Sequence, residues 1–191
     1  MLALAAITFT ACKKDDSANP GDEIAITSDL SSKQATTDIM VEDDNAVLFS
    51  ITDEENLNGG KFTGGGQSTN FVCATVTVTP ASGFPKTITL DFGSGCTNPN
   101  TGVTRSGKMI FILSDSLRIT GSTAVLSFDN YFVNGFKREG TITWTNVSTP
   151  GHRSWTRQVV AGKITAPNGN WWLHNALKTI SQVQGMGTFI P

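Results

Sequence analysis

From residue 71 onward, apolar and polar side chains alternate along the chain with a period of two. Residues 74–79 and 87–92 each alternate apolar side chains with polar ones, mostly threonine. This pattern is typical of strands that bury one face, and the turn residues between the two runs predict a hairpin. Matching the apolar faces pairs Val76 with Leu90 in antiparallel register.

The strand pattern continues along the chain. Residues 109–113 are apolar without a break, which predicts a strand covered on both faces. The next hairpin pairs Leu126 with Ile142 if its loop has three residues, 133–135, with glycine in the left-handed third position. In this register Phe132 shares the apolar face of Leu126.

A last hairpin is predicted around Asn168-Gly169. With these two residues as the loop, Ile164 opposes Leu173 and the apolar faces agree, which favours a type I′ turn. A short helix over residues 172–181 is the competing interpretation.

Residues 28–56 are the stretch with helical character. Ser28 or Asp29 is a suitable N-cap, and the apolar residues form a ragged stripe of Ile39, Met40, Val47, Leu48 and Ile51. The acidic run 42–44 weakens the helix prediction. Together with Asp53 and Glu54 it lacks the alternating ligands and central glycine of a calcium loop, so we interpret these residues as turn or solvated surface.

These elements predict a mainly β protein, an antiparallel meander of long hairpins with an N-terminal helical segment. The sheet is either sandwich-like or a single curved layer. The β domain is expected over residues 57–191, and its end at residues 189–191 has no evident cap, as in a truncated product.

The first residues have a different pattern. An apolar run from Leu2 to Phe9 leads to Phe9-Thr10-Ala11-Cys12, which resembles the lipobox of bacterial lipoprotein signal peptides. The usual leucine is replaced by Phe9, and the basic n-region of a signal peptide is missing. The resemblance implies that residues 1–11 are a signal peptide, that Cys12 is lipidated, and that residues 12–27 are a tether. The competing interpretation is an apolar N-terminus with a chance cysteine.

The residues after this cysteine indicate a cellular location. Cys12-Lys13-Lys14-Asp15-Asp16 resembles the export signal of surface lipoproteins in Bacteroidetes, which implies an outer-membrane protein that faces the medium. A solvated charged tether would have the same composition.

A wider resemblance covers about half of the chain. From Thr87 onward it is similar to a group of Bacteroidetes lipoproteins without an assigned activity. The matching segments are residues 91–96, 102–108, 128–135 and 185–188. The resemblance implies an all-β fold and an envelope location, and it supplies no catalytic residue.

Composition narrows the function. The 191 residues carry a net charge of −2 and only 16% charged residues, so no basic stripe is available for nucleic acid. An exported compartment is oxidising, which predicts a disulfide between Cys73 and Cys96. Their parities differ in a straight hairpin, so the bond requires an irregularity at Gly93 or Gly95. Two reduced thiols are the alternative, and a metal pair is disfavoured.

Catalytic signals are weak. His152 and His174 are the two histidines, and no nucleophile motif or metal-ligand spacing accompanies them. We therefore expect no enzyme, no cofactor and no metal. The carboxylates Asp91, Asp129 and Glu139 keep a hydrolase open as a second alternative.

The aromatic residues favour binding. In the predicted register Trp171 lies on the apolar face, whereas Trp172 and His174 lie on the polar face. Trp155, Trp172 and His174 are therefore candidate ligand-binding residues, and an exposed indole can stack on a sugar. Burial of the Trp172 indole under further strands or another layer is the interpretation that we favour. The sequence thus predicts a lipid-anchored surface lipoprotein acting as a structural or binding module, with a carbohydrate-binding module or adhesin as the alternative. Its expected partners are the membrane, through the lipid, and a glycan or another envelope protein.

Overall fold

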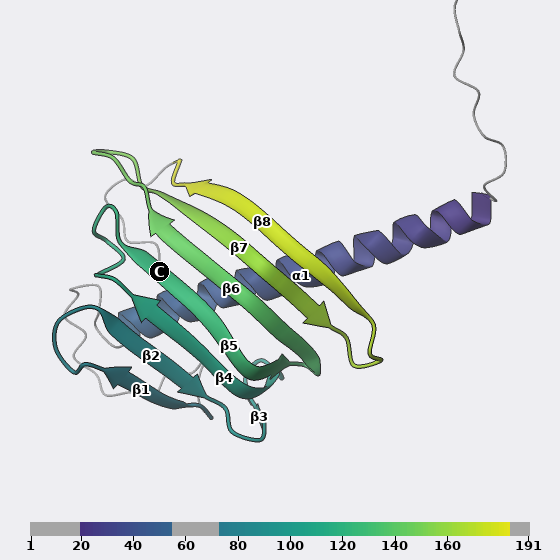
Figure 1. Cartoon of the computed structure of the whole chain (residues 1–191), viewed down its shortest axis with the longest axis horizontal. Helices are drawn as coiled ribbons and strands as arrows, with labels where there is room; N and C mark the ends of the chain where they lie inside the picture. The colour runs from purple at the N-terminus through teal and green to yellow at the C-terminus, as the bar shows by residue number, and fades with distance from the viewer. Residues whose placement is uncertain (1–19, 55–72, 184–191) are drawn as a thin grey trace, which may run out of the picture. The chain divides into compact units, whose positions relative to one another are not determined.

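The computed structural model describes residues 20–54 and 73–183, and the predictions for Cys12 and for both chain ends lie outside these residues (Figure 1). The chain divides into two compact units, Met1–Thr36 and Thr37–Pro191. The second unit contains the sheet and residues 37–54 of the helix. No helix of the described part is both long and apolar enough to cross a membrane.

The strands form one antiparallel sheet in which sequence neighbours pair (Figure 1). The order is β1-β2-β4-β5-β6-β7-β8, with the short β3 paired to β4. The predicted meander with an N-terminal helix is therefore confirmed, and the sheet is a single layer. The bounds are β1 (Thr75–Thr79), β2 (Lys86–Asp91), β3 (Cys96–Thr97), β4 (Thr104–Leu113), β5 (Thr123–Val133), β6 (Phe136–Asn146), β7 (Ser154–Thr165) and β8 (Trp171–Ser181).

The helix α1 spans Pro20–Glu54. It begins eight residues before the predicted start at Ser28, so part of the expected tether is helical. Proline suits the first helical turn because its missing N–H would have no partner there. Asp22 and Glu23 follow in the same turn, where negative charge complements the helix dipole.

The described residues of the first unit, 20–36, are a solvated helical segment. Ile24, Ile26 and Leu30 are exposed, and Lys33 pairs with Asp29 one turn earlier at 2.5 Å. An exposed ion pair of this kind adds only a few tenths of a kcal/mol, about 0.3–0.5.

The helical part of the second unit buries one side against the sheet, consisting of Thr37, Met40, Val41, Asp44, Asn45, Val47, Leu48, Ile51 and Thr52. The spacing of three and four residues is that of one helix face. Four of these nine residues are polar, which explains why the apolar pattern is ragged. The prediction was wrong for Ile39, which is 71% exposed, and right for Met40, Val47, Leu48 and Ile51.

The sheet has a helix-facing face and an outer face. The helix-facing side of β2, β4 and β5 supplies the core residues Ile88, Leu90, Met109, Phe111, Leu113, Ala124 and Leu126. The outer face carries the threonines. Val76 pairs with Leu90 as predicted. The prediction that β4 is covered on both faces was wrong, because Ile112 on the outer face is 47% exposed.

The β5–β6 hairpin keeps the predicted pairing of Leu126 with Ile142 but has a different turn, and Phe132, predicted to pair with Phe136, pairs with Lys137. Val133 pairs with Phe136, so the loop is Asn134-Gly135, with φ of 49° and 79°. Two positive φ values are those of a type I′ turn, and the predicted three-residue loop was wrong. Leu126 still opposes Ile142 because β5 holds an extra residue between Ser127 and Phe132.

That extra residue also reverses the faces of β5. Beyond it, Tyr131 and Val133 are buried, while Phe132 leaves the core face on which it was predicted. A shift of one residue turns every following side chain to the other face.

The β7–β8 hairpin is likewise one residue out of the predicted register. Its loop is Pro167-Asn168-Gly169. The Ala166 N–H donates to the Asn170 carbonyl at 2.7 Å, the Gly169 N–H donates to the Ala166 carbonyl at 2.9 Å, and Gly169 has a φ of 86°. Proline suits the first central position of a type I turn and glycine the left-handed position that follows, which gives the three-residue loop. The predicted type I′ turn was wrong.

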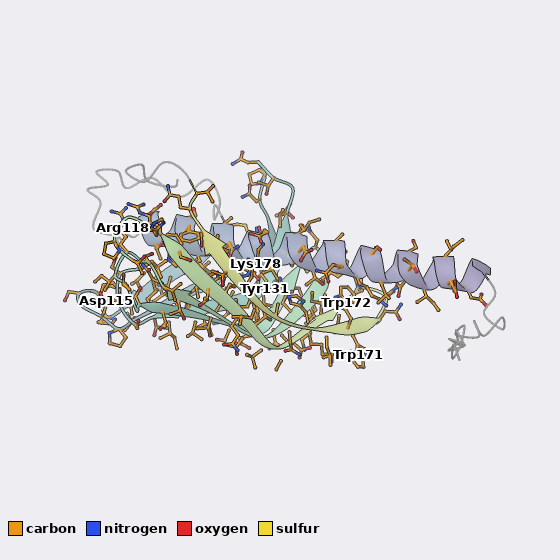
Figure 2. All side chains as sticks on the ribbon, turned by 90° about the horizontal axis from the view of Figure 1, so that it is seen from above. Asp115, Arg118, Tyr131, Trp171, Trp172 and Lys178 are labelled. Atoms are coloured by element: carbon orange, nitrogen blue, oxygen red, sulfur yellow. A yellow bond between two sulfur atoms is a disulfide. The ribbon has the colours of Figure 1, made fainter. Side chains whose placement is uncertain are left out.

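The shift of one residue changes the faces on which Trp171 and Trp172 lie. Trp172 pairs with Ile164 on the helix-facing face, and Trp171 pairs with Thr165. Figure 2 shows Trp171 and Trp172 on opposite sides of the sheet. The predicted placement of Trp171 on the apolar face and of Trp172 on the polar face was therefore wrong.

A line of irregular positions crosses four neighbouring strands. Gly107, Asn130, Gly140 and Ala161 all have positive φ, and each lies where the register between strands shifts. We call these four residues the bend row. Bulges bend and twist strands, so this row curves the sheet where β4 to β7 pass one another.

The predicted irregularity at the cysteines is also present. β2 ends at Asp91, and Gly93 and Gly95 have φ of 59° and 141° before Cys96 begins β3. The Sγ atoms of Cys73 and Cys96 are 2.05 Å apart, as in a disulfide bond. Closing a loop of this length removes unfolded-chain entropy worth roughly 3 kcal/mol.

Candidate binding cleft beside the helix

Three consecutive acidic residues of α1 each pair with an arginine on a different strand. We call these pairs the ion-pair row: Glu42 with Arg157 at 3.1 Å, Asp43 with Arg105 at 2.6 Å, and Asp44 with Arg138 at 2.7 Å. The three arginine side chains are buried. The prediction that Asp43 and Asp44 are turn or solvated surface was wrong, because these carboxylates hold the helix on the sheet.

Asp44 is the deepest member of the row. Its side chain is 1% exposed, and Oδ2 accepts a hydrogen bond from Arg138, while Oδ1 has no hydrogen-bond partner. Burial raises the pKa of Asp44 to about 6, against the attraction of Arg138. The carboxylate is therefore ionised at neutral pH, and Arg138 is its hydrogen-bonded counter-ion.

Glu42 is surrounded by donors. Asn45 donates to Oε2 at 2.6 Å, and Arg157 and Lys178 donate to Oε1 at 3.1 and 3.2 Å. Burial works to raise the pKa of Glu42, but the hydrogen bonds from Asn45 and Lys178 and the charge of Arg157 outweigh it and lower the pKa. Its negative charge is thus compensated by the protein.

Trp172 and His174 lie together on the helix-facing side of β8. The Trp172 indole donates to the Thr37 hydroxyl at 2.9 Å, and its ring meets the Phe136 ring edge-on. Burial, together with Arg138, lowers the pKa of His174. Both residues contact or face the helix, so neither forms an open aromatic platform.

Trp155 lies far from this pair. It pairs with Ile180, which is eight residues along β8 from Trp172. At 3.3 Å per residue the separation is about 26 Å. The structure therefore brings Trp172 and His174 together but not Trp155, and the three do not form one site.

Trp155 instead forms a wall shared by two adjoining cavities, which we call the cleft. The first, the apolar lobe, has a volume of about 290 Å³ and lies between α1 and the end of the sheet. Its apolar walls are Phe49, Leu117, Trp144, Trp155 and Ile180. The rings of Phe49 and Trp155 meet edge-on with centroids 6.3 Å apart.

The second cavity, the polar lobe, has a volume of about 330 Å³. Its own walls come from the β6–β7 connection, with Ser148, Thr149 and His152 among them. Arg118, Arg153 and Trp155 line both lobes. Figure 2 shows Arg118 at the opposite end of the sheet from Trp171 and Trp172.

Hydrogen bonds fix the loops that form the cleft. The buried Asn146 side chain donates to the Leu117 carbonyl at 2.7 Å, and its backbone exchanges hydrogen bonds with Gly121 and Ser122. Thr120 donates to the Ser148 carbonyl at 3.0 Å. The β4–β5 and β6–β7 loops are thus tied together, which is the pre-formed geometry expected of a binding site.

The Trp144 and Trp155 indoles differ in their hydrogen bonds. Trp144 donates to the Asn45 side chain at 2.6 Å. The Trp155 N–H is buried and has no hydrogen-bond partner. Buried donors are rarely left unpaired.

The side chains that line the cleft are suited to binding. Within residues 20–54 and 73–183, no group of three or more His, Cys, Asp or Glu side chains is arranged to hold a metal ion. His152 lines the polar lobe. The cleft offers aromatic walls, guanidinium groups and hydroxyl groups, which recognise apolar and polar parts of a ligand.

Sequence reasoning identified Trp155 and missed the rest of the cleft. Leu117, Arg118 and Arg153 lie outside the strands, where periodicity gives no signal. The ion-pair row did leave a trace. Arg157 has the parity of the buried Val159, and a charge in phase with apolar residues predicts a partner inside the fold.

Comparison of the chain with protein-family models, with curated proteins and with solved structures finds no match.

Proposed function

We propose that this protein is a lipid-anchored lipoprotein of the outer cell surface whose folded domain binds a small molecule in the cleft. The observation that carries the binding role is the apolar lobe, where three aromatic rings from α1, β6 and β7 surround a cavity of about 290 Å³. This volume lies near the lower end of the range for small-molecule sites. Binding without catalysis is supported by Glu42, whose carboxylate is already held by three donors.

The envelope location is supported by two features. Phe9-Thr10-Ala11-Cys12 and the residues that follow resemble a lipobox and a surface-export signal. The bonded pair of Cys73 and Cys96 suits an oxidising compartment.

Replacing Cys12 with serine is expected to abolish lipid attachment. Cells labelled with radioactive palmitate should mark the wild-type protein and leave Cys12→Ser unmarked, because only the thiol accepts the diacylglycerol. Unlabelled wild-type protein, or its recovery in the cytosolic fraction, would refute the proposed location. Such a result would leave the binding role untouched, because the probe titrations of the cleft test that role separately.

Filling the apolar lobe is expected to weaken binding of a neutral apolar probe, N-phenyl-1-naphthylamine. Ile180→Trp adds a large ring to the lobe from β8, and we expect a loss of affinity of about tenfold, which corresponds to about 1.4 kcal/mol. The measurement is a fluorescence titration of the full chain.

The matched control is Leu177→Trp, which makes the same kind of change on the outer face of β8, where Leu177 is 72% exposed. It should leave the affinity within about twofold, a difference of 0.4 kcal/mol. Equal effects of both variants, or no binding by the wild type, would contradict the cleft. The carbohydrate alternative would gain support if a glycan bound and Trp171→Ala abolished that binding, because Trp171 is 57% exposed.

A further inference from the structure

The two lobes of the cleft share Arg118, Arg153 and Trp155 and differ in the side chains that line each lobe alone. The apolar lobe has Phe49, Leu117 and Trp144 as walls that the polar lobe lacks. The polar lobe has hydroxyl, imidazole and guanidinium groups and no carboxylate among its lining residues. A ligand that occupies both lobes must therefore have two chemically different ends.

The charges identify the polar end. Arg118 and Arg153 line the junction between the lobes, and no acidic side chain lines the polar lobe beyond them. A guanidinium has five N–H donors, so one existing partner does not exhaust it. Two such groups favour an anion with several oxygens, such as a carboxylate, phosphate or sulfonate.

The carboxylates of the apolar lobe do not oppose this reading. Glu42 is compensated by Arg157 and Lys178 at 3.1 and 3.2 Å. Asp53 is exposed and lines only the apolar lobe. Neither carboxylate lines the polar lobe.

We propose that the cleft binds an anionic amphiphile, with its apolar body in the apolar lobe and its anionic head group in the polar lobe, against Arg118 and Arg153. This inference rests on the proposed binding function and adds the class of ligand. Trp155 separates the two ends of the ligand, because its ring is the one aromatic wall that the lobes share.

The test compares three probes on the full chain. 8-Anilinonaphthalene-1-sulfonate has an aromatic body and an anionic head, N-phenyl-1-naphthylamine has a similar body without the charge, and inorganic phosphate is a head group alone. In the double variant Arg118→Gln/Arg153→Gln, we expect the affinity for the sulfonate to fall about tenfold and that for the neutral probe to stay within about twofold. Phosphate at millimolar concentration should leave the sulfonate titration unchanged.

Lys163→Gln is the matched control, because Lys163 lies over the exposed Trp171 ring on the outer face. It should change neither affinity. The proposal that the ligand is an anionic amphiphile would be overturned if the double variant lost equal affinity for both dyes or lost none for the sulfonate. It would also be overturned if Lys163→Gln caused a similar loss, or if phosphate fully displaced the sulfonate. If the neutral probe still bound and Ile180→Trp still weakened it, the cleft would stand and only the ligand class would fall.

Discussion

Replacing Arg138 with methionine is expected to lower the free energy of unfolding by about 3–5 kcal/mol at pH 7. The change leaves the Asp44 carboxylate fully buried without its hydrogen-bonded counter-ion, and one of its oxygens already lacks a partner. Urea unfolding followed by tryptophan fluorescence measures the loss. In the double variant Asp44→Leu/Arg138→Met, most of it should be recovered, because an apolar pair of similar volume needs no compensation.

The control and the pH dependence make this prediction specific. Lys137→Met, on the same strand, removes a partly exposed pair with Glu139 and should cost less than about 1 kcal/mol. The folded pKa of Asp44, about 6, lies above its ordinary value of 3.8, so its protonation favours the folded state as the pH falls through 6. Without Arg138 that pKa rises further, and the deficit of Arg138→Met should shrink by roughly 1 kcal/mol between pH 7 and pH 5. A deficit no larger than that of Lys137→Met would show that the pair is not important for stability.

Gly107→Ala is expected to destabilise the fold by about 3 kcal/mol or more, from backbone strain together with a clash. Gly107 has a φ of 74°, and an added Cβ would lie 2.1 Å from the Asn130 carbonyl oxygen in the bend row. Backbone atoms of two central strands cannot move apart without breaking the hydrogen bonds around them. The same urea titration provides the value.

Gly102→Ala separates the two causes. Gly102 has nearly the same φ, 71°, but nothing within 4 Å of an added Cβ. We expect a cost of about 1 kcal/mol from the left-handed conformation alone. Similar losses at both positions would mean that the close approach of β4 and β5 does not decide the stability.

The fold class followed from the sequence because alternation of side chains is a local signal. The pairing of Val76 with Leu90 needed only matching faces and a turn between them. Where the predicted strand faces were wrong, in β5 and β8, one residue more than expected in the strand or its loop was responsible. In β5 the extra residue reverses the faces of Tyr131 and Phe132, and no local preference announces a bulge of this kind.

The two hairpin loops show the limits of turn chemistry. Asn-Gly occurs in both, yet Asn134-Gly135 is a two-residue loop, while Pro167 extends the loop at Asn168-Gly169 to three. The preceding proline was the local signal. Once the register of β8 is shifted by one residue, Trp171 and Trp172 exchange faces, and the candidate aromatic platform is lost.

The candidate site was less accessible to sequence reasoning than the fold. Trp155 was identified by residue type alone, and its neighbours Phe49, Leu117 and Arg153 come from a helix and two separate loops. Their meeting depends on how α1 is placed along the sheet. That placement depends on the ion pairs of Glu42, Asp43 and Asp44. A helix prediction based only on an apolar stripe takes no account of these charges.

The ion-pair row fixes the position of α1 along the sheet. A helix held only by leucine and valine could slide along a sheet by one turn at modest cost. Here, a slide of four residues would put Ala46, Val47 and Leu48 where Glu42, Asp43 and Asp44 now stand, and three buried guanidiniums would lose their counter-ions. The three acidic residues thus fix the position of the helix that places Phe49 opposite Trp155, and this position sets the dimensions of the apolar lobe.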